Sequence, residues 1–225
     1  MEFYSFEHGR WRGSVEWDHS MHFIPRQPCS KHGPRSGGRA GHLRIILPSA
    51  RVADFVWTWY SECLLAARAV RVLQHERLKG FRLRTVAVTQ LKNGRYGPAP
   101  ELEELVVTGW AGQSPGASGI TLEEYCRECG YTHYSAPTHP EHLIEESQWD
   151  GSDFFIVWPM PGHIFVTERV LQVATANNLK GAAFVPVSEM RHLADGFTPG
   201  SLEHYFSPQV VRRRKADVDY LKWEH

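Results

Sequence analysis

The stretch LLAARAVRVLQHERLKGFRLRTV at 64–86 aligns without gaps with FVTERVLQVATANNLKGAAFVPV at 165–187. Both stretches contain an arginine at the same place, Arg68 and Arg169, and both contain a Leu-Lys-Gly triplet. Each pattern predicts a strand, a short helix that a glycine ends, and a second strand. A repeated unit whose helix covers a shared sheet would explain the alignment. A coincidence between two ordinary helix–glycine–strand junctions would also explain it, and both explanations stay open here.

The rest of the chain alternates short apolar runs with loops. Leu43–Leu47 is apolar and lies between a glycine and a proline, and 153–158 is apolar and ends at prolines, so both are expected to be buried strands. The alternating residues of 81–91 predict a half-buried strand. Residues 25–42 are rich in proline and glycine and predict a loop. We therefore expect an α+β or α/β fold with a mixed sheet and a few short helices.

The composition limits the classes of function. The chain has 225 residues, of which 42% are hydrophobic, so it can bury a sizeable core. Lys and Arg together number 25, as do Asp and Glu, and a chain without net charge is not built around phosphate attraction. We find no apolar run long enough to span a bilayer and no secretory signal at the N-terminus. These features predict a cytoplasmic protein for which nucleic acid is an unlikely partner, with an exposed, charged tail at 212–225.

Two short motifs carry metal chemistry. Cys126-Arg127-Glu128-Cys129-Gly130 has the spacing of a zinc knuckle, in which two thiolates face one ion and a glycine admits the turn. A structural zinc needs four ligands, and Cys29-Ser30-Lys31-His32-Gly33 supplies a second pair with the same spacing. The predicted site is therefore Cys29, His32, Cys126 and Cys129, holding a structural Zn²⁺. The alternatives are that the two pairs are relics of a metal site, or that their cysteines are ordinary buried thiols, as Cys63 is expected to be.

Catalysis at this site is not expected. The chain has no His-x-Glu upstream of the second motif, as in nucleobase deaminases, and no HExxH, as in metalloproteases. Four protein ligands would also leave no position open for a reacting water molecule. We therefore expect no enzyme, no catalytic residues and no organic cofactor.

The two separated motifs, each followed by glycine, make the chain resemble the double-CXXCG motif family, known mainly from myxobacteria. The start Met1-Glu2-Phe3-Tyr4 and the closing segment from Ile164 through Leu179-Lys180-Gly181 to Val187 are also similar to that family. The motif positions of the family fall on Cys29, Gly33, Cys126, Cys129 and Gly130, whereas His32 stands where the family has cysteine. The departure at His32 puts the bound metal in doubt and leaves the expected fold unchanged.

The resemblance implies an immunity protein of swarming-inhibition and related polymorphic-toxin systems, whose partner is one cognate toxin. It also implies a single immunity-type domain over 1–225, which could form two lobes, 1–120 and 121–225, joined through the Cys/His site. The alternatives are a zinc-dependent hydrolase or deaminase-like enzyme and a zinc-stapled nucleic-acid-binding module. Interface anchors are often aromatic, which makes Trp57, Trp59, Tyr60 and Trp110 candidates, although each is more often a core residue.

Overall fold

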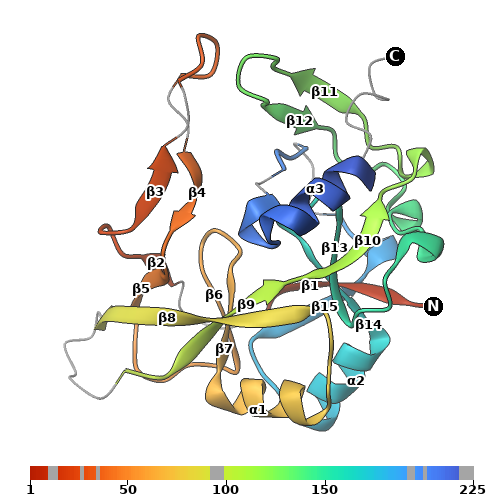
Figure 1. The fold of residues 1–225 in the computed structure, drawn as a ribbon. Helices are drawn as coiled ribbons and strands as arrows, with labels where there is room; N and C mark the ends of the chain where they lie inside the picture. The colour runs from red at the N-terminus through yellow and green to blue at the C-terminus, as the bar shows by residue number, and fades with distance from the viewer. Residues whose placement is uncertain are drawn as a thin grey trace.

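The computed structural model describes residues 1–9, 15–25, 28–33, 36–91, 99–191, 196–199 and 202–217. The pair Asn93-Gly94, whose residue types predict a turn, lies outside them. The fold is α+β, with mixed sheets and a few short helices, as the sequence predicts. Two sheets make up the body, two hairpins project from one side of it, and two helices, α1 (Ala67–His75) and α2 (Glu168–Ala176), lie on the opposite side (Figure 1).

The first sheet has six strands in the order β2-β5-β8-β9-β7-β6. Their bounds are Glu16–Trp17 (β2), Leu43–Leu47 (β5), Phe55–Trp57 (β6), Cys63–Ala66 (β7), Phe81–Leu91 (β8) and Leu102–Val107 (β9). The second sheet has five strands in the order β10-β13-β14-β1-β15. Their bounds are Phe3–His8 (β1), Gly109–Gln113 (β10), Phe154–Trp158 (β13), Ile164–Thr167 (β14) and Ala182–Pro186 (β15).

The two projecting hairpins are small two-stranded sheets. One pairs β3 (His22–Pro25) with β4 (Ser36–Ala40), and the other pairs β11 (Leu122–Tyr125) with β12 (Thr132–Tyr134). Near the C-terminus, α3 (Pro208–Asp217) contacts β10. Five single-turn 3-10 helices, at 116–118, 140–142, 146–148, 187–189 and 202–204, complete the described elements.

The two aligned stretches build the same unit in the same register. Strands β6 and β7, helix α1 and strand β8 form one unit, and β13, β14, α2 and β15 form the other. In each unit a further strand pairs between the last two: β9 lies between β7 and β8, and β1 lies between β14 and β15. Glu104 of β9 is opposite both Leu64 and Arg84, just as Ser5 of β1 is opposite Phe165 and Val185. The equivalence therefore includes a fourth strand that the sequence alignment does not contain.

The fourth strands come from different parts of the chain. Strand β9 is the next strand after β8, so all six strands of the first sheet lie within 16–107. Strand β1 precedes the whole first unit, yet it completes the sheet of the second unit. The second sheet therefore cannot be completed by the second half of the chain alone.

Each unit has one aspartate that binds the Leu-Lys-Gly turn of the other unit. The Asp54 carboxylate accepts a hydrogen bond of 2.8 Å from the backbone N–H of Lys180, and the Asp153 carboxylate accepts one of 2.8 Å from that of Lys79. Both aspartates are largely buried and immediately precede the first strand of their unit. Hydrogen bonds to an ionised carboxylate are stronger than neutral ones, so these contacts are among the strongest between the units.

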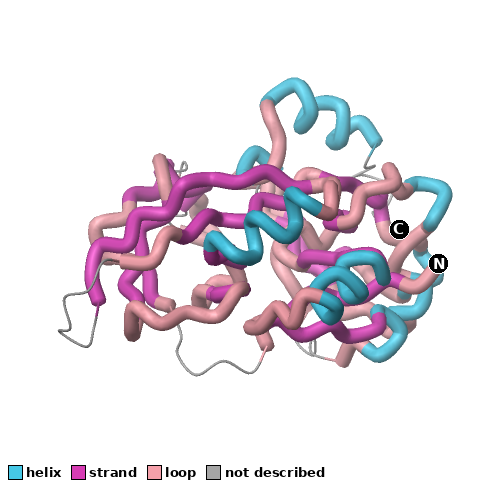
Figure 2. Tube along the Cα trace, turned by 90° about the horizontal axis from the view of Figure 1, so that it is seen from below, coloured by secondary structure: helices cyan, strands magenta, loops and turns pink. Residues whose placement is uncertain are grey.

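The aligned arginines add further contacts between the units, at the ends of the two helices. Arg68, at the start of α1, forms a bidentate pair with Asp54 and donates to the carbonyls of Asn177 and Asn178, beyond the end of α2. Arg169, at the start of α2, pairs with Asp153 and donates to the carbonyl of Glu76, beyond the end of α1. The helices therefore lie side by side with opposite directions, and they face the viewer in Figure 2.

Glycine is required in both Leu-Lys-Gly turns. Gly80 and Gly181 have φ of +90° and +100°, a conformation that other residues rarely adopt. A Cβ atom at either position would lie 2.0 Å from the backbone oxygen of the facing strand, that of Phe154 or Phe55. The glycines therefore let each turn touch the first strand of the other unit.

The largest hydrophobic core lies between the two units. It is built from residues of both sheets and from the inner faces of both helices, including Phe6, Phe55, Trp57, Leu73, Phe154 and Val173. Each sheet also has a separate core on its other face, around Leu43, Ile45 and Leu64 in the first sheet and around Tyr134, Phe155 and Phe165 in the second. The central core makes the two units one folding body.

Three local expectations need correction. Residues 25–42 are not all loop, because β4 pairs with β3 across the proline- and glycine-rich segment. The charged tail expected from Arg212 begins inside α3, and 218–225 lie outside the described residues. Thr167 is the N-cap residue of α2, a position where a threonine hydroxyl is expected to cap the first turn, but its hydroxyl donates to Asp153 and makes no cap hydrogen bond. At Thr167, a partner distant in sequence outweighs the local pattern.

We predict that Asp54→Ala and Asp153→Ala destabilise the protein by similar amounts, about 2 kcal/mol each, because each leaves a backbone N–H without its charged acceptor. Urea unfolding followed by circular dichroism measures the change. The exposed residue Glu141 provides a control, since Glu141→Ala should change stability by less than about 0.5 kcal/mol. A substantial loss for only one aspartate would contradict the equivalence of the two docking contacts.

Candidate metal centre

The two cysteine motifs form similar turns at the ends of the two projecting hairpins. In the β3–β4 hairpin the N–H of Gly33 donates to the carbonyl of Cys29 at 2.8 Å, and in the β11–β12 hairpin the N–H of Gly130 donates to that of Cys126 at 2.8 Å. The two glycines have φ of +65° and +66°. The backbone thus gives both motifs the same turn, and the two ligands of each motif face the same cluster.

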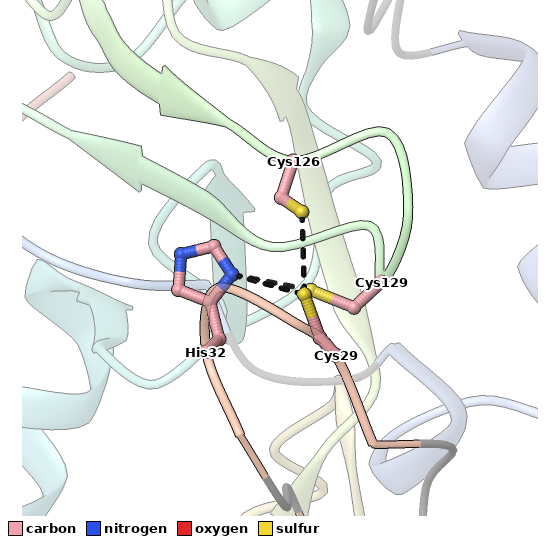
Figure 3. A group of neighbouring side chains, drawn as sticks. All are labelled: Cys29, His32, Cys126 and Cys129. Carbon is pink, nitrogen blue, oxygen red and sulfur yellow. Dashed lines mark hydrogen bonds between the residues drawn. The ribbon is translucent and has the colours of Figure 1, made fainter.

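The four predicted ligands lie together (Figure 3). The Sγ of Cys29 is 3.6 Å from the Sγ of Cys126, and Nδ1 of His32 is 3.5 Å from the Sγ of Cys29 and 3.5 Å from that of Cys129. All four donor atoms lie within 4.8 Å of one another. The clustering predicted from the sequence is therefore confirmed, across 97 residues of chain between Cys29 and Cys126. The cluster could hold a metal ion.

Burial at the site affects the protonation of its thiols. Cys29 is 3% exposed, and the other three residues are partly buried. Burial raises the pKa of the Cys29 thiol, because a buried thiolate without a counter-charge is poorly solvated. A cation among the donors would stabilise the thiolates, which are the form that binds metal.

Two carboxylates next to the second motif link the hairpins, and sequence analysis did not single them out. Glu124 of β11 pairs with Lys31 and lies 3.1 Å from Nε2 of His32. Glu128 accepts hydrogen bonds from the N–H and the hydroxyl of Ser30, at 2.9 and 2.6 Å. These hydrogen bonds, from Lys31 to Glu124 and from Ser30 to Glu128, lower the pKa of each carboxyl. The only signal in the sequence is their closeness to the cysteines, which many acidic residues share by chance.

A buried ionic network fixes the β3–β4 hairpin to the body. Arg39 of β4, whose side chain is 3% exposed, lies 2.5 Å from Glu104 of β9, whose side chain is 2% exposed. Arg84 of β8 also contacts Glu104, at 2.7 Å, and His204 lies 3.6 Å from it. Burial alone would raise the pKa of Glu104, but the His204 and Arg84 contacts and the charge of Arg39 outweigh it and lower the pKa to about 2. The hairpin that carries Cys29 and His32 is therefore held by a charged pair in the interior.

The other residues considered from the sequence lie elsewhere. Cys63 is fully buried in the central core, as expected for a structural thiol. Of the aromatic candidates for an interface, Trp57 and Trp110 are buried, whereas Trp59 and Tyr60 are 69% and 61% exposed at the turn between β6 and β7. Of these four candidates, only Trp59 and Tyr60 therefore remain available to a partner.

Comparisons with known proteins do not assign the chain to a family. No protein-family model matches the chain, and no curated protein is significantly similar to it. Among the described residues, no helix combines the length and the hydrophobicity needed to cross a bilayer. The donor set and its geometry therefore carry the functional argument.

We predict that Cys126→Ala releases bound metal and lowers the melting temperature, because it removes one of four donors and separates the hairpins. Metal content after gel filtration and thermal unfolding measure the two effects. Cys63→Ala is the matched control, since it removes a thiol from the core and should lower stability without releasing metal. A wild-type protein that carries no metal and melts like Cys126→Ala would contradict the prediction.

We predict that Glu104→Gln destabilises the protein by about 3 kcal/mol at pH 7, because it removes the closest counter-charge of the buried Arg39 and leaves it only the more distant Glu62 at 3.9 Å. The folded-state pKa of Glu104 is lowered, so its stabilising contribution is present above the unfolded-state value and is lost as the pH falls from about 4.5 to about 2. Urea unfolding between pH 7 and pH 3 tests both statements. The difference between wild type and variant should shrink on acidification, and a constant difference would count against the assignment.

Proposed function

We propose that the protein is an immunity protein that binds one cognate bacterial toxin in the cytoplasm and neutralises it, and that a structural Zn²⁺ holds its two projecting hairpins together. The observation that carries this proposal is the joining of both motifs into one four-donor cluster. The same two motifs are the basis of the resemblance to the double-CXXCG immunity proteins.

Zinc is the metal that the donors favour. Three thiolates and one imidazole form a soft donor set of the kind found in structural zinc sites. A tetrahedral ion with Zn–S bonds of about 2.3 Å would hold its sulfurs about 3.8 Å apart. The observed Sγ–Sγ distance of 3.6 Å and the two Sγ–Nδ1 distances of 3.5 Å are close to that geometry.

A binding role has more support than the two alternatives. A catalytic zinc keeps a coordination position for water, whereas here four protein donors are available, and the Glu124 carboxylate faces the far nitrogen of His32. A nucleic-acid-binding module would need a basic surface around the knuckles. The basic side chain of Lys31 is instead paired with Glu124, and Glu128 adds a further negative charge.

Exposed aromatic side chains give the binding role a candidate surface. Trp59 and Tyr60 project from the β6–β7 turn, and the Tyr60 ring stacks on Trp17 with a centroid distance of 3.6 Å. Stacking fixes the orientation of an aromatic side chain before a partner arrives, which reduces the entropy lost on binding. Large exposed aromatics of this kind are common anchors of protein interfaces.

We predict that co-expression of this protein rescues cells from the toxin encoded by the neighbouring gene. Trp59→Ala should weaken the rescue and the affinity for the purified toxin, measured by calorimetry, by at least about 10-fold, as expected for an interface anchor. The variant Tyr125→Ala is a control that should rescue cells and bind the toxin like the wild type, because Tyr125 is also exposed but lies on the β11–β12 hairpin. Rescue that is absent for the wild-type protein, together with no binding to that toxin, would reject the immunity role.

A further inference from the structure

His32 is the one donor of the cluster that could bind a metal ion through either of two atoms. An imidazole ligates through Nδ1 or through Nε2, and the nitrogen that carries the proton cannot ligate. In this structure Nδ1 lies 3.5 Å from the sulfurs of Cys29 and Cys129, whereas Nε2 lies on the opposite side of the ring (Figure 3). Ligation in this orientation therefore requires a proton on Nε2.

Glu124 stands where it can accept that proton in a hydrogen bond. Its Oε1 lies 3.1 Å from Nε2 of His32, and an ionised carboxylate can only accept. Lys31, the neighbour of His32, donates to the same carboxylate oxygen. One side chain of the β11–β12 hairpin thus contacts two consecutive residues of the β3–β4 hairpin.

The surroundings also restrict the orientation of the imidazole. Tyr131 stacks on the His32 ring with a centroid distance of 4.5 Å and an interplanar angle of 30°. Glu124 itself is held in β11, where its backbone lies opposite that of His133 in β12. A ring flip would keep this stacking but would move Nε2 away from Glu124 and place a carbon against it, so the stacking holds the ring plane and the hydrogen bond decides between the two orientations.

We propose that Glu124 is a positioning residue for the metal centre: it selects the His32 tautomer whose free Nδ1 faces the three thiols, and it holds the ring in that orientation. The inference rests on the proposed zinc but not on the toxin-binding role. Carboxylates that accept from a ligating histidine commonly orient the ring and raise its basicity.

The second knuckle shows why only one carboxylate is needed for this purpose. Cys129 occupies in its motif the place that His32 occupies in the other, immediately before the glycine. A thiolate has no tautomer to select and no ring to orient. The role of Glu124 should therefore exist only while residue 32 is histidine, and this dependence separates ligand positioning from general support of the hairpins.

The first experiment measures zinc affinity of the full-length protein by competition with a chromophoric chelator. Glu124→Ala should weaken zinc binding about 10- to 100-fold, as is typical when such an acceptor is lost. Glu124→Gln keeps an acceptor oxygen and should recover most of the affinity. Glu123→Ala is the matched control, because Glu123 lies on the same strand and its carboxylate is 3.5 Å from His133, and it should bind zinc like the wild type.

The second experiment repeats Glu124→Ala in the His32→Cys background, where the site has four thiols. The loss of affinity caused by Glu124→Ala should disappear there. Absorption of the Co²⁺-loaded proteins provides an independent readout: when His32 is retained, Glu124→Ala should change the ligand-field bands, while the thiolate charge-transfer band persists.

The outcomes are distinct. Equal zinc affinity of Glu124→Ala and wild type would overturn the positioning role and leave the zinc proposal standing. An equal loss in the wild-type and His32→Cys backgrounds would also overturn it, because Glu124 would then act by supporting the hairpins. A wild-type protein that binds no zinc would overturn this inference together with the zinc proposal. The toxin-binding proposal, which is tested separately, would remain.

Discussion

The fold depends on the reciprocal docking of two equivalent units. Asp54 and Asp153 each bind the Leu-Lys-Gly turn of the other unit, and the second sheet receives its inner strand β1 from the segment that precedes the first unit. These contacts are made only when both units are folded, so they couple the two units. The cooperative body that results provides a common base for the two hairpins that carry the ligands.

The metal centre, like the body, joins two similar halves. Each hairpin supplies two donors, which is half of what a tetrahedral ion requires, and the glycine that follows each motif gives both turns the same backbone conformation. The position of one half-site relative to the other is set by the body and by the buried pair of Arg39 and Glu104. A metal ion at the site would therefore stabilise an arrangement that the interior has already established.

The candidate metal centre and the exposed aromatic pair lie at different places in the fold. The four donors lie on the two projecting hairpins, the Glu124 carboxylate contacts one of them, and the exposed aromatic pair of Trp59 and Tyr60 lies at the turn between β6 and β7. The separation means that metal binding and partner binding can be altered by different substitutions. Stability and recognition can therefore be measured independently of each other.

The sequence by itself determined the fold class, the two strand–helix–strand stretches and the identity of the four clustered residues. These features depend on local periodicity, on glycine at required turns and on ligand spacing, all of which are visible along the chain. Only the tertiary structure decided that β1 completes the second sheet, that Asp54 and Asp153 face the opposite turns, and that Glu124 faces His32. The contacts of these three carboxylates join residues 74 to 126 positions apart, and no local pattern records which of many similar carboxylates will meet which partner.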